Sequence, residues 1–168
     1  MKKAITIEHI QTELTSNFDR FTFNLEKALG VLTPSALQAL GASPASMASY
    51  LTNVSGENNL VLFNILLQGD LTDNQNKINI KQYQIGNPKL MLRIIANHAA
   101  AGLYLPVHLL VYEKYPGKAM IEYDLPSSLF AQFDNPEILS DSVALENKLI
   151  ELIRIADADS EVECQTRL

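Results

Sequence analysis

The hydrophobic pattern at the start of the chain predicts a strand followed by a helix. Residues 5–14 are rich in β-branched side chains, and about half of them alternate between apolar and polar, which favours a strand. In residues 16–30, apolar side chains recur at helical spacing, Ser16 is a candidate N-cap, and Gly30 is a candidate helix end. The apolar positions of this expected helix are Phe18, Phe21, Leu25 and Leu29.

Residues 33–52 contain two short segments that each begin with a capping residue and a proline. Thr33 precedes Pro34, and Ser43 precedes Pro44, which suits the first helical position. The pattern predicts two short helices, and we interpret them as an insertion into the fold.

Two strand pairs follow, each joined by a segment of turn-forming residues. The runs NLVLFNILLQG and KINIKQYQIG are separated by DLTDNQN, which favours an antiparallel hairpin. The runs LPVHLLVYEK and KAMIEYDL form a second expected hairpin around Pro116 and Gly117. A helix beginning after Asn87 lies between the two hairpins.

The last ordered element is predicted to be an amphipathic helix near residues 139–157. Its polar side carries Glu146, Lys148, Glu151 and Arg154. Its apolar side is formed by Val143, Leu145, Leu149, Leu152, Ile153 and Ala156.

This order predicts an α+β fold with two layers. We expect an antiparallel sheet of about four to five strands with helices on one face, in the order strand, helix, two inserted helices, two strands, helix, two strands, helix. Residues 1–134 are expected to form a single domain that contains the insertion at 33–52. Residues 135–158 would be a C-terminal helical extension packed on it, and residues 159–168 a flexible tail.

Charge and composition exclude several classes of partner. Thirteen basic and nineteen acidic residues among 168 give a net charge of −6, which repels nucleic acids and anionic membranes. No apolar run reaches the length of a membrane span, and the N-terminus lacks the apolar core of a signal peptide. The single cysteine, Cys164, cannot form an intrachain disulfide. We therefore expect a cytoplasmic protein with no nucleic-acid or membrane partner.

A series of short motifs runs through residues 86–126, about a quarter of the chain. Its positions are Gly86, Asn87, Pro88, Leu103, Leu105, Pro106, Val111, Tyr112, Gly117, Lys118, Tyr123 and Pro126. With these motifs the chain resembles the domain-of-unknown-function 302 family. The resemblance implies a compact α+β domain of bacterial type, commonly dimeric, without an established activity and without catalytic residues to transfer.

Two histidines in this stretch have different expected environments. His98 falls on the apolar side of its helix with Met91 and Ile94, which favours a hydrogen-bonded core or boundary residue over a ligand. His108 lies on the more polar side of its strand, opposite Leu109. That side is a candidate ligand or self-association surface, and the alternative is a face that is simply covered by helices. Its candidate binding residues are Tyr104, His108, Tyr112 and Tyr123.

Other kinds of site have weaker support. A metal site would need His9, His98 and His108 to converge from distant segments, so no metal and no cofactor are expected. No nucleophile motif or phosphate-binding loop is present in the sequence. The helix start at Asn87 and Lys89 could bind an anion, but helix capping explains the same residues.

These observations predict a non-enzymatic cytoplasmic module that self-associates as a dimer and binds a small ligand around His108. One alternative is a small-molecule enzyme that uses His108 and a tyrosine as acid and base. Another alternative is an interaction subunit of a larger complex, which would use the helices at 33–52 and 139–157.

Overall fold

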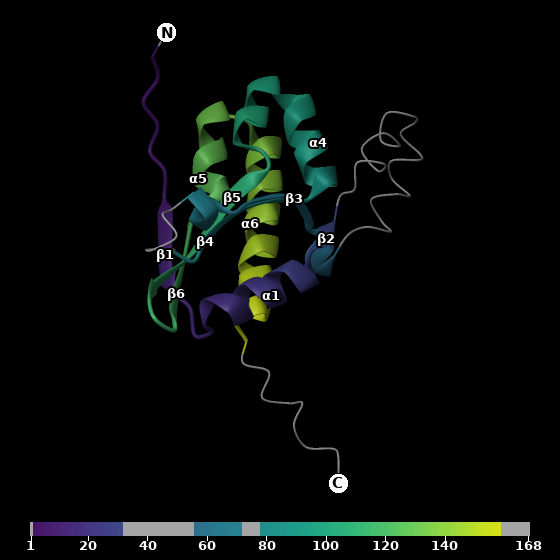
Figure 1. Cartoon of the computed structure of the whole chain (residues 1–168). Helices are drawn as coiled ribbons and strands as arrows, with labels where there is room; N and C mark the ends of the chain where they lie inside the picture. Colours follow the sequence, from purple (N-terminus) through teal and green to yellow (C-terminus); the bar gives the residue numbers. More distant parts are fainter. Residues whose placement is uncertain (1, 32–55, 72–77, 159–168) are drawn as a thin grey trace.

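The computed structural model describes residues 2–31, 56–71 and 78–158, which form an α+β fold around a mixed six-stranded sheet (Figure 1). Neighbouring strands are antiparallel, except that β2 runs parallel to β3. Across the sheet, the strands are β1 (His9–Glu13), β6 (Lys118–Asp124), β5 (Val107–Tyr115), β4 (Ile80–Gly86), β3 (Val61–Leu66) and β2 (Gly30–Val31).

The sheet is larger than the predicted antiparallel sheet of four to five strands. The missed strand is β2, in which Gly30 and Val31 pair with Val61 and Leu62 of β3. A two-residue strand is too short to show alternation, and Gly30 resembled a helix end. The predicted inserted helices at 33–52 lie outside the described residues.

Both predicted hairpin pairings are confirmed. β3 pairs with β4, and β5 pairs with β6, each in antiparallel orientation. The turn between β5 and β6 contains Gly117 with a φ angle of 78°, a left-handed conformation that glycine adopts without the steric cost of a Cβ atom.

In the described residues, four α-helices accompany the sheet: α1 (Phe18–Ala28), α4 (Pro88–Asn97), α5 (Pro126–Phe130) and α6 (Pro136–Asp157). Short 3₁₀ turns are η1 (Glu57–Asn59), η2 (Gln68–Leu71), η3 (Ala99–Tyr104) and η4 (Ala131–Phe133). Asn17, and not the predicted Ser16, caps α1, because its side chain accepts a hydrogen bond from the Arg20 amide. The four predicted apolar positions of this first helix segment are all buried.

The main core lies between the sheet and helices α1 and α6. Figure 1 shows α6 between α4 and α5, with α1 crossing near its C-terminal end, and α6 contacts all three helices. From the sheet, the core takes Tyr83, Ile85, Val107, Leu109, Val111, Ala119 and Ile121; from α6 it takes Leu145, Leu149, Leu152 and Ala156.

The long C-terminal helix is therefore part of the main core. It begins at Pro136, three residues before the predicted start, because Asn135 accepts hydrogen bonds from the amides of Glu137 and Ile138. The predicted domain boundary after residue 134 stays a prediction, and residues 159–168 lie outside the described residues. Within the described ranges, no helix has the length and apolar character needed to cross a membrane.

Candidate site on the open face of the sheet

The sheet has one face toward the core and a second face, here called the open face, that points away from it. In β5, Val107, Leu109 and Val111 are buried in the core, so the alternate residues His108 and Tyr112 lie on the opposite side. Strand register extends this face over four strands. It carries His9, Gln11, Glu13, Ile80, Gln82, Gln84, His108, Leu110, Tyr112, Met120, Glu122 and Asp124.

A group of polar side chains surrounds Glu122 on the open face, and we call it the Glu122 cluster. The Glu122 Oε1 atom accepts hydrogen bonds from the Tyr112 hydroxyl at 2.6 Å and the Gln11 Nε2 atom at 2.5 Å. The imidazole of His9 lies between two carboxylates, with Nε2 3.2 Å from Glu122 Oε2 and Nδ1 2.8 Å from Asp124 Oδ1. The cluster therefore joins strands β1, β5 and β6.

Hydrogen bonding shifts the pKa values of three members of the Glu122 cluster. The pKa of Glu122 is lowered by the hydrogen bond from the Tyr112 hydroxyl, which has the largest effect, and by the hydrogen bond from the Gln11 amide. The same contact raises the pKa of Tyr112, because the carboxylate accepts its proton in a hydrogen bond. Hydrogen bonds to Asp124 and then Glu122 raise the pKa of His9. At neutral pH the cluster thus combines an ionised carboxylate with a protonated phenol.

His108 and Tyr112 share the open face, as the alternation in their strand predicted. His108 is exposed, and its Nε2 atom lies 3.2 Å from the side-chain nitrogen of Gln84. With the amide of Gln84 as donor, the Nε2 atom of His108 acts as the acceptor. The Glu122 cluster is a separate group of contacts on the same face.

Tyr104 and Tyr123 do not join the other two predicted binding residues. Tyr104 belongs to η3, where its ring packs edge-on against Phe130 and Phe133. The strand begins only at Val107, so strand alternation does not extend back to Tyr104. Tyr123 packs against the main core, and burial raises its pKa. The predicted group of four tyrosine and histidine side chains is therefore divided between both sides of the sheet and a neighbouring turn.

The expectation that His98 is a core or boundary residue is wrong with respect to burial. Helix α4 ends at Asn97, one residue earlier, so His98 is exposed and its ring packs against Phe133 with ring centroids 4.7 Å apart. The backbone of His98 is extended, so the helical spacing of the apolar residues does not continue to this position.

The candidate anion site at Asn87 and Lys89 begins with a well-formed helix cap. Asn87 is 6% exposed, and its side-chain oxygen accepts a hydrogen bond from the Leu90 amide at 3.0 Å. Its side-chain nitrogen donates to the carbonyl of Asn59 at 2.8 Å. Capping thus uses both polar atoms of the Asn87 side chain, while an anion-binding role for Lys89 stays a prediction.

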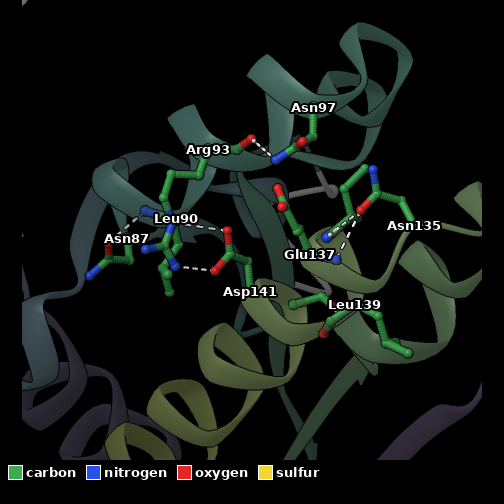
Figure 2. A network of polar contacts seen from close by, with 10 residues as sticks. Asn87, Leu90, Arg93, Asn97, Asn135, Glu137, Leu139 and Asp141 are labelled. Carbon is green, nitrogen blue, oxygen red and sulfur yellow. Dashed lines mark hydrogen bonds and ion pairs between the residues drawn. The ribbon is translucent and has the colours of Figure 1, made fainter.

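A second polar region lies between helices α4 and α6 (Figure 2). Arg93 donates two hydrogen bonds to the carboxylate of Asp141, which is 7% exposed, and Asn97 bonds to the Arg93 carbonyl. Beside this pair is an open cleft of about 520 Å³ that Glu137 and Ser140 also line. The paired charges join the two helices, and this pairing depends on helix packing that sequence periodicity does not reveal.

Sequence reasoning missed Gln11 and Glu122 as hydrogen-bond partners of Tyr112, and it missed Glu122 and Asp124 as partners of His9. A signal was present in β6, because the apolar residues Ala119 and Ile121 alternate with the residues of the open face. Pairing of β1 with β6 had no comparable signal. Among the described residues, no group of three or more histidine, cysteine or acidic side chains has a geometry that could hold a metal ion.

Comparison with known proteins gives a family-level match. A family model described as "Domain of unknown function DUF302" matches residues 43–156, which include most of α6. A similar fold occurs in the crystal structure of an uncharacterized conserved protein DUF302 from Bacillus stearothermophilus, with a TM-score of 0.59 and 15% sequence identity. The similarity covers 88% of this chain and 97% of that one. No curated protein matches the sequence significantly.

Proposed function

Since this chain belongs to the DUF302 family, whose description assigns no activity, we propose its function from its own surface. We propose a non-enzymatic cytoplasmic module that self-associates and binds a small polar ligand on the open face of its sheet. The observation that carries this proposal is the Glu122 cluster, which places fixed polar groups on an accessible sheet surface.

The composition of the open face supports a ligand that carries hydroxyl or amino groups. The carboxylates of Glu122 and Asp124 accept hydrogen bonds, and the side chains of Gln82 and Gln84 can both accept and donate. Leu110 and Tyr112 lie half-buried between these polar groups and offer apolar contact area. Small-molecule sites commonly combine such apolar area with a few oriented polar groups.

The acid–base alternative has less chemical support. The hydrogen-bond partner of His108 on this face is Gln84, whose amide neither takes up nor releases a proton at neutral pH. The pKa of Tyr112 is raised by its hydrogen bond to Glu122, which makes its hydroxyl a weaker proton donor near neutral pH. The alternative role as a subunit of a larger complex stays a prediction, and its helices at 33–52 lie outside the described residues.

Two measurements test the proposal. Light scattering coupled to size-exclusion chromatography should show a species larger than the 18.6 kDa chain. A thermal-shift screen of sugars, polyols and small amines should identify a stabilising ligand whose effect is lost in Glu122→Gln and Tyr112→Phe. His98→Ala, which changes an exposed histidine on another part of the molecule, should keep the ligand effect. A monomer at all concentrations would overturn self-association, and equal shifts in all variants would overturn the proposed ligand face.

A further inference from the structure

The outer edge of β1 is available for pairing. β1 is the terminal strand of the sheet, with β6 on its inner side. The Leu14 amide donates to the Ala119 carbonyl at 2.9 Å, and the Leu125 amide donates to the Glu8 carbonyl at 2.9 Å. In an antiparallel ladder these contacts alternate, so the even-numbered residues of β1 bond to β6. The backbone groups of His9, Gln11 and Glu13 therefore point outward.

The segment before β1 does not fold back over this edge. The Glu8 amide donates to the Ser128 hydroxyl at 3.0 Å, and the Lys3 ammonium donates to the Gln132 carbonyl at 2.6 Å. These contacts hold residues 3–8 against α5 and η4. Within the described part of the chain, the sheet order places no strand outside β1, which lies at the margin of the sheet in Figure 1. An unpaired edge of this kind is a template for another strand.

We infer that β1 of a second copy pairs antiparallel with this edge, with the two Gln11 residues opposite each other on the two-fold axis. The inference rests on the self-association part of the proposed function and names its contact surface. The outward-pointing backbone groups limit the possible registers. Only the odd-numbered residues of β1 point their amide and carbonyl groups outward, so each must lie opposite an odd-numbered residue of the partner's β1. Centring the pair on Gln11 meets this condition over all five residues of β1.

The charges of His9 and Glu13 favour the register centred on Gln11 over the registers on either side of it. Centring on Gln11 places His9 opposite the partner's Glu13, and by symmetry Glu13 opposite the partner's His9. If the register is shifted by two residues in either direction, neither His9 nor Glu13 faces a charged residue of the partner's β1. Each then faces an uncharged residue or a position outside β1. The pKa of His9 is raised by Asp124 and Glu122, which favours the protonated form that would attract a carboxylate. Glu13 also keeps its contact with Lys118 at 3.0 Å.

This pairing would leave the open face accessible and extend it. Side chains of directly opposed residues lie on the same side of an antiparallel sheet, so the two open faces form one surface. Gln11 of each copy already contacts Glu122 of its own sheet. The two Glu122 clusters would therefore lie on either side of the two-fold axis, and self-association would bring two proposed ligand sites together.

Disulfide formation at the axis tests the register. Opposed residues of a hydrogen-bonded antiparallel pair have Cα atoms about 5.5 Å apart, which is within the range for a disulfide. In a Cys164→Ser background, Gln11→Cys should form a covalent dimer under mild oxidation. His9→Cys should not, because two copies of residue 9 would be offset by roughly 13 Å along the strands.

Proline at position 11 tests the backbone contact. Gln11→Pro removes an outward amide while sparing the bonds of β1 to β6, and it should weaken the dimer roughly tenfold or more. Gln11→Ala keeps the amide and is the matched control, with folding of both variants followed by circular dichroism. If the protein is a dimer that neither cross-links at position 11 nor weakens with proline, the pairing of β1 with β1 is overturned while self-association stands. If the wild type is a monomer, both the interface and self-association are overturned.

Discussion

The carboxylate of Asp157, at the end of α6, accepts a hydrogen bond from the backbone amide of Ser16 at 2.8 Å. The two residues are 141 positions apart in the chain. The second carboxylate oxygen of Asp157 accepts a hydrogen bond from the Thr15 amide at 3.0 Å. The backbone carbonyl of Asp157 accepts hydrogen bonds from the side-chain hydroxyls of Thr15 and Ser16. One residue thereby joins the connection between β1 and α1 to the C-terminal end of the core helix.

Asp157→Ala should lower the free energy of unfolding by about 1–3 kcal/mol, because it leaves two backbone amides without their acceptor. Urea denaturation followed by circular dichroism measures the change. Glu151→Ala is the control on the same helix, since it removes only an exposed pair with Arg154. Equal effects of the two substitutions would show that the contact with Ser16 contributes nothing to stability.

Adjacent residues of α6 should differ strongly in their contribution to stability. Leu149 is 0% exposed in the main core, whereas Ile150 is 44% exposed. Leu149→Ala should cost about 2–5 kcal/mol through lost burial and a cavity, and Ile150→Ala about 1 kcal/mol or less. Chemical denaturation of both variants measures the contrast. A small effect of Leu149→Ala would mean that α6 can leave the core without unfolding it.

The spacing of apolar residues predicted most of the helices and strands because that spacing recurs several times within each of them. Phe18, Phe21 and Leu25 mark one side of a helix over two turns, and Val107, Leu109 and Val111 mark one side of a strand. β2 has only two residues and therefore no period to detect. His98 shows the opposite error, because a helical pattern continued past the residue where the helix ends.

The candidate site could be predicted only in part because its members come from distant strands. His108 and Tyr112 are four positions apart in one strand, and alternation places them on one face. His9 contacts Asp124 across 115 positions of sequence, through a pairing of β1 with β6 that local patterns do not encode. Tyr123 lies on the core side because Met120, Glu122 and Asp124 are the residues of β6 on the open face.

The turn between β5 and β6 should be sensitive to a side chain at Gly117. Its φ of 78° is costly for other residues although the space around a Cβ atom is open. Gly117→Ala should therefore lower the free energy of unfolding by about 1–2 kcal/mol through backbone strain alone. Gly102→Ala is the matched control, since its Cβ would meet Ile95 at 3.8 Å, an ordinary contact. Thermal unfolding that is unchanged in Gly117→Ala would contradict the left-handed turn.

His9 should make stability depend on pH on the alkaline side. Its pKa in the folded protein is raised from the ordinary 6.5 by hydrogen bonds to Asp124 and then Glu122. A raised folded-state pKa means that the stabilisation is complete below pH 6.5 and is lost as the pH rises through the folded-state value. The urea concentration at the midpoint of unfolding should therefore be higher for the wild type than for His9→Gln. This difference should be largest near pH 6 and should shrink as the pH rises through the folded-state pKa of His9.

Ionic strength and a second histidine provide the controls for this pH effect. His9 is exposed, so added salt should reduce the difference between wild type and His9→Gln at low pH. His98→Gln changes an exposed histidine that packs on Phe133, and it should not reproduce the pH-dependent difference. If the difference between wild type and His9→Gln instead grew with rising pH, the carboxylates of Asp124 and Glu122 would not be stabilising the imidazolium of His9.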